Sequence, residues 1–410
     1  MPNIPGMPDW VRKIKSDMPI LDRKINGHPL CYADSAATTL KPRQVIQAIS
    51  DFYHTSNANI QRGIHTLGEE ATTQYEQVRS DVAQFIGARQ KSEIVFTHGA
   101  TEGINTIAHA WGLGHIGPQD TIVTTELEHH ANLLPWQWLA QTTGAQLIVV
   151  PVMPDGSLDM IALENAITSR TKLVAVTALS NVIGVRVNLA PIITRAHAVG
   201  AKVLVDAAQL VPHYQINVQD MGADFLVFSA HKMLGPTGVG VLYIRHELHD
   251  EISPYQRGGG TVFSVGTHTA TFLPVPQLLE AGTPPIAQVI GLGAAIRYIK
   301  ENIDFKKLAR HEAALCAELI AGLREHKNIR ILGDPDLISR EGHMVSFVVD
   351  TMHAHDVAAL FDSQGICVRA GHHCAQPLAT RLGVSSSVRV SFYAYNSRCD
   401  VLRILEAIRL

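Results

Sequence analysis

A lysine and a carboxylate stand at the ends of two successive apolar segments. The apolar run 225–228 leads through Ser229 to Lys232, and the run 202–205 leads directly into Asp206. Pyridoxal phosphate (PLP) needs such a pair, a lysine for the Schiff base and an acid that keeps the pyridine nitrogen protonated. A lone lysine at a strand end is more often simply exposed, but Asp206, as a partner of the correct type, favours a PLP site.

Residues around this pair could hold the rest of the cofactor. Ser229 and His231 carry groups that can donate to a phosphate, and Gln209 could hydrogen-bond the phenolic oxygen of PLP. Thr101 opens a helix-like stretch, and free N–H groups at a helix N-terminus form a natural phosphate site. A plain N-cap at Thr101 is compatible with that role, and Asp206 taken alone could be a cap or a turn residue.

Two adjacent histidines, His129 and His130, follow another strand-like segment. Neighbouring positions face different sides of a helix or a strand, and no third ligand is spaced to match, so we do not expect a metal site. We predict instead that the His129 ring stacks on the PLP ring or moves a proton. The glycine-rich stretch 235–240 lacks the Gly-Lys-Ser/Thr ending of a nucleotide-binding loop, and we discount it.

One of the five cysteines, Cys374, lies in the polar sequence Gly-His-His-Cys. Arg369, His372 and His373 surround it with actual or potential positive charge, which lowers a thiol pKa and favours the thiolate. We therefore predict a nucleophile at Cys374, although a buried structural cysteine is the usual alternative. We expect the structural role for Cys31, Cys316 and Cys367. We assign no role to Cys399.

An arginine alternates with apolar residues near the C-terminus, at Arg389 within the run 388–391. It is either an exposed residue on a strand face or a binding group. In a PLP enzyme it would suit the α-carboxylate of an amino acid, which arginine binds bidentately. Asn181, shortly after the strand-like segment 172–178, could assist it.

The elements that position these residues alternate between about residues 90 and 245. Near-continuous apolar strands separated by helix-length stretches indicate a mostly parallel sheet with both faces covered. In such sheets ligands bind beyond the carboxyl ends of the strands, where the candidate residues fall. We expect seven strands at 93–97, 121–125, 146–151, 172–178, 202–206, 225–229 and 240–245, with helices that include 158–168 and 189–199.

The pattern changes after about residue 285 and indicates a smaller α+β unit. The stretch 256–285 is rich in Gly, Thr and Pro and is interpreted as a long loop. We expect a large domain over residues 22–290 and a small domain formed by 1–21 and 291–410. The elements expected in the small unit are helices at 289–301, 305–324 and 400–410, and strands at 344–349, 367–370 and 387–391.

The bulk composition narrows the class of protein. The 410 residues are 46% hydrophobic and 17% charged, and 34 basic against 37 acidic side chains give a net charge of −3. This balance gives no electrostatic case for binding nucleic acid or an anionic membrane. No apolar run reaches the length of a membrane span, five cysteines make no disulfide framework, and we expect no signal peptide at the N-terminus. We therefore expect a cytoplasmic protein.

Together these motifs resemble the cysteine desulfurases of the class V aminotransferase family, within the fold-type I PLP-dependent transferases. The resemblance is greatest to the type II group, which contains the SUF-system desulfurase, cysteine sulfinate desulfinase and selenocysteine lyase. It covers nearly the whole chain, in stretches at 32–39, 62–65, 128–132, 135–136, 180–182, 206–209, 229–232, 280–284, 369–377 and 389–396.

The resemblance implies a role for each candidate residue. It implies catalysis by Lys232, Cys374 and His129. It implies cofactor binding by Thr101, His129, Asp206, Gln209, Ser229, His231 and Lys232, and by Thr283 from the other subunit of a homodimer. It implies substrate binding by Asn181, Arg389, Arg369 and His65.

The implied reaction converts L-cysteine to L-alanine and leaves a persulfide on Cys374. A short loop cannot travel far, so a separate acceptor protein would collect the sulfur for iron-sulfur cluster assembly. Selenocysteine lyase and cysteine sulfinate desulfinase remain alternatives on the same scaffold, with L-selenocysteine as a further substrate. Cys374 argues against kynureninase- or epimerase-like reactions, and together with Lys232 and Asp206 it argues against a non-catalytic scaffold. The hypothesis of a metal-binding module has even less support from the sequence.

Overall fold

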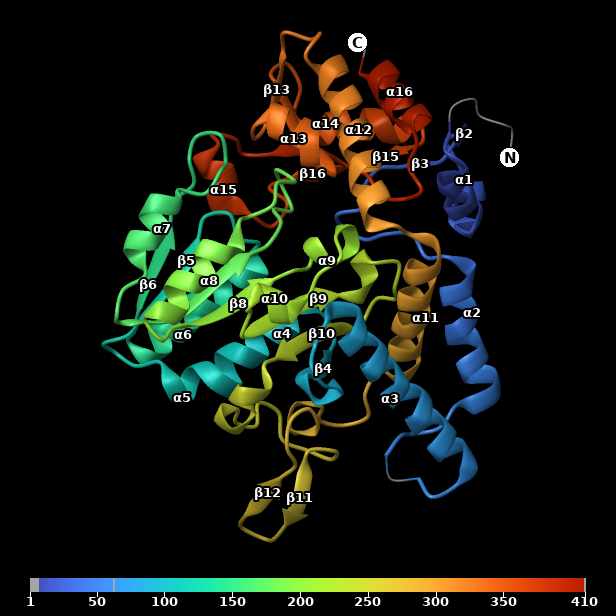
Figure 1. Cartoon of the computed structure of the whole chain (residues 1–410). Coiled ribbons are helices and arrows are strands. Elements are labelled where there is room, and N and C mark those ends of the chain that lie inside the picture. The colour runs from blue at the N-terminus through green and yellow to red at the C-terminus, as the bar shows by residue number, and fades with distance from the viewer. Residues whose placement is uncertain (1–6, 62, 409–410) are drawn as a thin grey trace.

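The computed structural model describes residues 7–61 and 63–408, and it places a seven-stranded sheet at the centre of the larger part of the molecule (Figure 1). Arg62, within one of the stretches of the resemblance, lies outside the described residues. In spatial order the strands are β4 (Ile94–Thr97), β10 (Gly240–Ile244), β9 (Phe225–Ser229), β8 (Lys202–Asp206), β7 (Thr171–Thr177), β5 (Thr121–Thr125) and β6 (Gln146–Val150).

The sheet is parallel from β9 to β6, and β10 runs antiparallel to both of its neighbours. Strands β8 and β9 are buried along nearly their whole length, which explains their continuous apolar sequences. Asp206 ends β8 and pairs with Thr177 at the end of β7. The predicted mostly parallel seven-stranded sheet is confirmed, and its strand ends bring the candidate residues to one edge.

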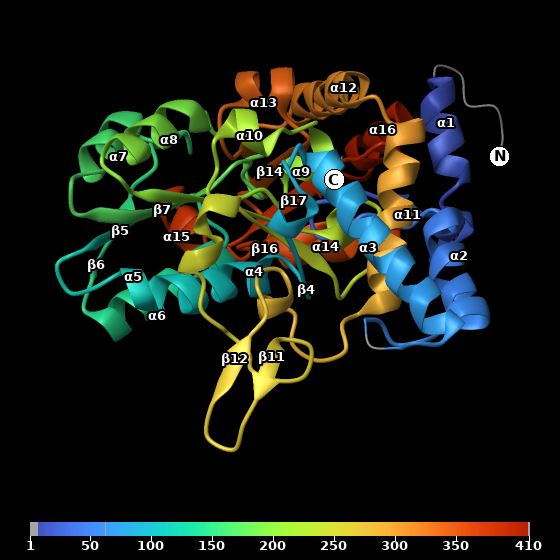
Figure 2. The ribbon, with the colours of Figure 1, turned by 60° about the horizontal axis from the view of Figure 1, so that its bottom comes forward.

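Side chains on successive positions of each central strand enter two different hydrophobic cores. Val203 and Val205 belong to one core, while Leu204 belongs to the other. Figure 2 shows α7 (Met160–Ala166) and α8 (Leu189–Ala198) on one side of the sheet, and α4 (Ala100–Ile107) and α6 (Leu134–Thr143) on the other. The long helices α3 (Thr66–Ile86) and α11 (Ile286–Asn302) pack against each other and complete the first core.

A second, antiparallel sheet has the strand order β13 (Ile329–Ile331), β14 (Met344–Val349), β17 (Ser387–Ser391) and β16 (Arg369–Gly371). Three helices pack with it in a separate core: α12 (Phe305–Leu323), α14 (Ala354–Ser363) and α16 (Arg398–Ala407). The strand expected at 367–370 is two strands, because β15 (Ile366–Cys367) leaves this sheet and pairs with β3 (Cys31–Tyr32). The division of the chain into two domains at residues 22 and 290 remains a proposal.

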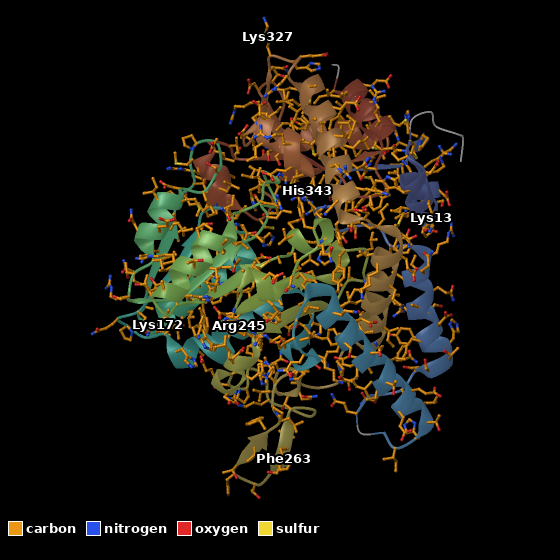
Figure 3. The ribbon with its side chains drawn as sticks, in the orientation of Figure 1. Lys13, Lys172, Arg245, Phe263, Lys327 and His343 are labelled. Carbon is orange, nitrogen blue, oxygen red and sulfur yellow. The ribbon has the colours of Figure 1, made fainter. Side chains whose placement is uncertain are left out.

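The segment interpreted as a long loop contains a β-hairpin, so that interpretation is wrong in part. Strands β11 (Val262–Val265) and β12 (Ala270–Phe272) pair with each other and project from the body of the molecule (Figure 1). Figure 3 shows Phe263 on this projection, where its side chain is 78% exposed. An exposed two-stranded ribbon has no buried face to impose an apolar alternation on its sequence, and the pattern therefore missed it.

The remaining elements are short. They are α1 (Asp9–Ser16), α2 (Arg43–Asp51), α5 (Leu113–His115), α9 (Leu210–His213), α10 (Val218–Met221), α13 (Pro335–Glu341) and α15 (Gln376–Arg381), with strands β1 (Lys24–Ile25) and β2 (His28–Pro29). None of the helices in residues 7–61 and 63–408 is both long enough and apolar enough to cross a membrane.

Candidate active site

A cavity of about 210 Å³ lies at the carboxyl ends of the central strands. Thr177, Asp206 and Ser229, the last residues of β7, β8 and β9, all line it. The second sheet contributes its own residues to the opposite wall, so the cavity lies between the two sheets. The predicted site residues that it brings together are Thr101, His129, Asn181, Asp206, Gln209, Ser229, His231, Lys232, Arg369, Cys374 and Arg389.

Lys232 and Asp206 share this cavity as predicted. Lys232 ends a short 3₁₀ turn that follows β9, and Asp206 is only 6% exposed. Burial lowers the pKa of Lys232 to about 8, and the nearby Asp206 partly opposes this shift. Burial raises the pKa of Asp206, while a 2.9 Å hydrogen bond from the backbone N–H of Ala208 and the charge of Lys232 act against it. A lysine with a lowered pKa has the free amine that a carbonyl cofactor requires.

The N-terminus of α4 meets Ser229 at the edge of the cavity. The backbone N–H of Ala100 donates to the Ser229 hydroxyl at 2.9 Å, and Thr101 lines the cavity from the first turn. The N-cap is Gly99 rather than Thr101. A Cβ at Gly240 would lie 2.5 Å from the Cα of Gly99, so the close approach of β10 requires glycine there. Free N–H groups beside a hydroxyl suit a phosphate.

Four buried polar atoms on residues that line the cavity lack a hydrogen-bond partner among the described residues: Gln209 Oε1, His231 Nδ1, His373 Nδ1 and Arg389 Nε. The amide nitrogen of Gln209 donates to the carbonyl of Ala36 at 2.8 Å, which leaves its oxygen free. Burial, Lys232 and Lys41 lower the pKa of His231 to about 4, so its ring is neutral. Leaving such groups unpaired costs about 1–3 kcal/mol each. These atoms therefore fit a polar group that fills the cavity, as PLP would.

The two adjacent histidines diverge. Burial and the charge of Lys232 lower the pKa of His129 to about 4, and its Nδ1 accepts a 3.0 Å hydrogen bond from the N–H of Ala131. His130 turns toward the cysteine loop, where its Nε2 accepts from the N–H of Gln376 at 3.1 Å. Over residues 7–61 and 63–408, no group of three or more His, Cys, Asp or Glu side chains is arranged to hold a metal ion.

A buried loop carboxylate supports His129 from behind, and the sequence analysis missed it. Glu128 accepts hydrogen bonds from Thr125 Oγ1 at 2.7 Å, from Asn132 Nδ2 at 2.6 Å and from the N–H of Thr177 at 3.0 Å. Burial raises the pKa of Glu128 to about 8. The network fixes the loop that carries His129 to β5 and β7. The spacing of four residues between Glu128 and Asn132 was the available signal.

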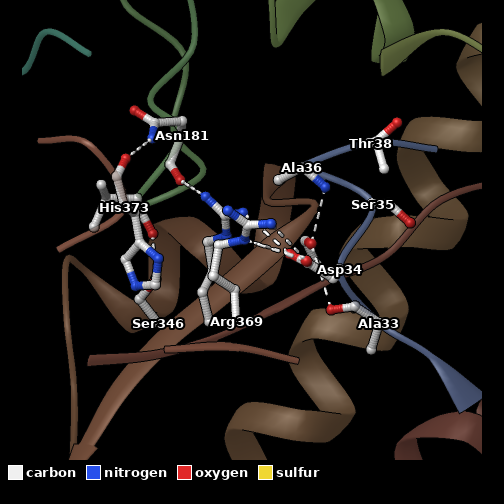
Figure 4. Close-up of polar contacts among 12 residues, drawn as sticks. Ala33, Asp34, Ser35, Ala36, Thr38, Asn181, Ser346, Arg369 and His373 are labelled. Carbon is white, nitrogen blue, oxygen red and sulfur yellow. Dashed lines mark hydrogen bonds and ion pairs between the residues drawn. The ribbon is translucent and has the colours of Figure 1, made fainter. Parts of the chain in front are cut away.

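Two arginines converge on one aspartate at the second sheet's side of the cavity (Figure 4). Arg389 is 2% exposed and donates through Nη1 to the carbonyl of Asn181 at 2.7 Å and through Nη2 to Asp34 Oδ1 at 3.3 Å. Arg369 donates through Nε to Asp34 Oδ2 at 3.2 Å. Asp34 lies within the stretch 32–39 of the resemblance, but no local signal in the sequence marks it as a partner of both arginines.

Cys374 lies in a tightly held loop between β16 and α15. His373 and Cys374 both have positive φ, 54° and 57°, which is uncommon for residues other than glycine. The N–H of Cys374 donates to His372 Nδ1 at 3.1 Å, and its carbonyl accepts from the N–H of His130 at 2.7 Å. The side-chain amide of Asn181 donates to the carbonyl of His373 at 2.7 Å.

The exposed Cys374 belongs to two cavities at once. It lines the inner cavity together with Lys232, and it also lines an outer basin of about 430 Å³. The basin has His353, His355 and His372 in its wall. A thiol in this position can reach a molecule on either side.

Two predicted site residues do not line the cavity that the described residues of a single chain form. His65 is the N-cap of α3, where its Nδ1 accepts from the N–H of Gly68 at 3.2 Å. Thr283 is exposed in the loop that precedes α11. The roles implied for these two residues therefore remain proposals.

Comparisons with known proteins agree with this geometry. The model of the family described as aminotransferase class-V matches residues 31–404. A probable cysteine desulfurase of Streptomyces coelicolor is 43% identical over 413 residues, which cover 100% of this chain and 98% of the relative. A cysteine desulfurase of Haloferax volcanii is 43% identical over 411 residues, 97% of this chain and 96% of the relative.

Solved structures give the same assignment. The apo cysteine desulfurase of Thermococcus onnurineus has a TM-score of 0.91 and 40% identity, and the match covers 100% of this chain and 98% of that one. The cysteine desulfurase CsdA of Escherichia coli, in an S-sulfonic acid form, has a TM-score of 0.89 and 36% identity over 97% of both chains. The predicted fold and family are thus confirmed, and the chain belongs to the class-V aminotransferase family.

Proposed function

We propose that this protein is a PLP-dependent cysteine desulfurase, which releases L-alanine from L-cysteine and retains the sulfur as a persulfide on Cys374. The observation that carries the proposal is the position of Cys374 in the wall of the cavity that also contains Lys232, Asp206 and Arg389. The relatives named as cysteine desulfurases cover the whole length of the chain and support the same reaction.

The residues at the strand ends fit PLP. Lys232 would bind it covalently, Asp206 would pair with its ring nitrogen, and His129 would lie against the ring. Bound PLP would withdraw electrons from the substrate's α-carbon. The phosphate would meet the N-terminus of α4 and the side chains of Ser229 and His231, and Gln209, which lines the same cavity, would lie at the phenolic oxygen.

Arg389 is the proposed anchor for the substrate carboxylate. Its Nη1 and Nη2 are held by Asn181 and Asp34, and its buried Nε lacks a partner among the described side chains and backbone. These two bonds use two of the five N–H groups of the guanidinium, so its position is fixed while Nε–H and other donors remain for a carboxylate. A substrate held there would lie in the cavity that contains both Lys232 and Cys374.

Lys232 would move the protons. With a pKa of about 8 it has a substantial neutral fraction near pH 8, so its amine can take the proton from the substrate's α-carbon and return it elsewhere on the bound molecule. The low pKa of His129, about 4, keeps that ring neutral, so it adds no positive charge beside the amine.

Cys374 would take the sulfur. Its thiolate attacks the substrate sulfur, an S–S bond forms and the Cβ–S bond breaks. The electron pair of the broken bond stays with the carbon fragment, which leaves as L-alanine after it is protonated. The outer basin then gives a second thiol access to the Cys374 persulfide, and we propose that an acceptor protein collects the sulfur there for iron-sulfur cluster assembly.

We further propose that the protein works as a cytoplasmic homodimer. Thr283 is exposed and lies apart from its own chain's cavity among the described residues, so it is available to reach the phosphate site of a partner. On the projecting hairpin, Phe263 is 78% exposed and Val265 is 68% exposed. A second subunit would cover this apolar surface. All five cysteines are free, as a reducing compartment requires.

The proposal is tested by measuring alanine and sulfide release from L-cysteine by the PLP-loaded protein with a reductant. Equal amounts of both products, lost in Lys232→Ala and in Cys374→Ser, support it. Turnover of cysteine that survives Cys374→Ser would refute the nucleophile. Faster release from L-selenocysteine or from cysteine sulfinate than from cysteine would favour the alternative reactions on this scaffold.

A further inference from the structure

Asp34 is the common partner of the two arginines at the cavity, and it follows β3 in a distant part of the sequence. Its carboxylate accepts from Arg389 Nη2 at 3.3 Å and from Arg369 at 3.2 Å. Figure 4 shows Arg369 directed at Asp34. The side chain of Asp34 is 14% exposed, and that of Arg389 is 3% exposed. Asp34 therefore holds one guanidinium in the protein interior and a second one nearer to solvent.

The charges in this wall do not cancel. Two guanidinium groups, on Arg369 and Arg389, share the single negative charge of Asp34. His373, which lines the same part of the cavity, adds no positive charge, because burial lowers its pKa to about 3. The three ionised groups together leave one positive charge, which matches one carboxylate.

We propose that Asp34 determines the charge of the substrate that this site accepts. This inference rests on the proposed function, in which Arg389 binds the α-carboxylate of an amino acid. With Asp34 in place, the arginine pair favours an amino acid whose side chain is uncharged, such as cysteine. Asp34 acts through the two arginines and is a positioning residue rather than a catalytic one.

The physical argument concerns the second anionic group. An amino acid with an acidic side chain brings two negative charges to a wall that offers one. Arg369 and Cys374 both line the cavity and the outer basin, so a substrate whose sulfur lies at Cys374 would bring its side chain toward this wall, and the charge of Arg369 is already paired with Asp34. Removing the charge of Asp34 would release Arg369 for a second anion, whereas an uncharged side chain would gain nothing from that release.

The test measures how two amino acids without sulfur, L-alanine and L-aspartate, bind the purified PLP-loaded protein, followed by the change in cofactor absorbance. In Asp34→Asn we expect the preference for alanine over aspartate to fall about tenfold, the effect of one charge-assisted hydrogen bond. In Arg369→Gln we expect the preference to rise. The double variant, which carries both Asp34→Asn and Arg369→Gln, again has one net positive charge in this wall. Its preference for alanine over aspartate should return to within about threefold of the wild type.

The controls separate charge from structure. Glu341→Gln, which removes an exposed ion pair with Arg186 at 3.1 Å, should leave the preference unchanged. Equal weakening of both probes in Asp34→Asn, or a double variant that does not recover, would overturn the inference. If the wild type binds alanine but releases none from cysteine, the proposed function fails while the preference still tests the role of Asp34.

Discussion

The side-chain amide of Asn181 donates a 2.7 Å hydrogen bond to the carbonyl of His373, the residue that precedes Cys374. The backbone carbonyl of Asn181 accepts a bond of the same length from Arg389. Asn181, in the segment that follows β7, therefore connects the proposed carboxylate anchor with the loop of the proposed nucleophile. The relative position of the two groups is set by this residue rather than by either sheet alone.

Asn181→Ala removes the bond to the cysteine loop and retains the backbone contact to Arg389. We expect kcat/KM for cysteine to fall about tenfold, because losing one buried hydrogen bond costs about 1–2 kcal/mol and the Cys374 loop loses its fixed position. Alkylation of Cys374 by iodoacetamide should become faster as the loop loosens. Unchanged turnover together with an unchanged alkylation rate would contradict this account.

The lowered pKa of Lys232 predicts how the apoprotein takes up PLP. Only the neutral amine attacks an aldehyde, and burial lowers the pKa of this amine to about 8. The capture rate should rise about tenfold per pH unit below pH 8 and level off above it. Stopped-flow absorbance at several pH values measures this directly. A rate that keeps rising to about pH 10, as for an ordinary lysine, would show that the pKa is not lowered.

Three buried histidines predict a loss of stability in acid. Burial lowers the pKa of His213 and of His373 to about 3, and that of His343, labelled in Figure 3, well below its ordinary value. Below about pH 6.5 the unfolded chain takes up protons that the folded protein cannot, and each histidine then costs about 1.4 kcal/mol per pH unit. Buried Glu312, whose pKa is raised, acts in the opposite direction above about pH 4.5.

The net expectation is that the free energy of unfolding falls as the pH drops from 6 to 5. The three histidines opposed by Glu312 contribute about 3 kcal/mol per pH unit, while His129 and His231 add to this fall and buried Glu128 opposes it. Urea unfolding at pH 7, 6 and 5 measures this slope. His343→Leu should reduce the slope by about 1.4 kcal/mol per pH unit. A slope that this variant leaves unchanged would show that His343 does not contribute.

The loop that carries Thr283 is anchored by a buried ion pair. Arg79 and Glu280 are 1% and 3% exposed, and their closest atoms lie 2.6 Å apart. Glu280 also accepts from the backbone N–H of Phe96 at 2.8 Å. Removing one partner of a buried pair leaves the other charge uncompensated, so Glu280→Gln should lower the free energy of unfolding by about 3 kcal/mol. A loss below about 1 kcal/mol would mean that this pair does not anchor the loop.

Thr283→Ala provides the matched variant on the surface of the same loop. Its side chain is exposed, so the stability of the chain should stay within about 0.5 kcal/mol of the wild type. If Thr283 reaches the phosphate of a partner subunit, PLP should bind about tenfold more weakly, as equilibrium dialysis would show. Unchanged PLP affinity would remove Thr283 from the site.

Burial explains which elements the sequence predicts well. Strands β5, β8 and β9 have the predicted bounds, because strands covered on both faces are continuous apolar runs bounded by polar residues. Lys232 and Asp206 were found because each stands at the end of such a run. The direction of β10 could not be predicted, since an antiparallel strand inside a covered sheet has the same apolar sequence as a parallel one.

Long-range polar contacts explain what the sequence did not reveal. Asp34 and Arg389 are separated by 355 positions, and Asn181 and His373 by 192. Pairing at such distances leaves no periodic signal in either segment. The motifs around Asn181 and Arg389 identified each residue as a carboxylate-binding candidate, but only the structure shows that Asp34 holds the second guanidinium beside the first.

The most direct test of the central claim is the mass of the Cys374 peptide after the PLP-loaded protein reacts with L-cysteine without a reductant. We predict that this peptide gains the mass of one sulfur atom, that the gain disappears when a thiol is added, and that Lys232→Ala shows none. If alanine forms while the sulfur is found on another cysteine or only in solution, Cys374 is not the sulfur carrier and the proposed mechanism is contradicted.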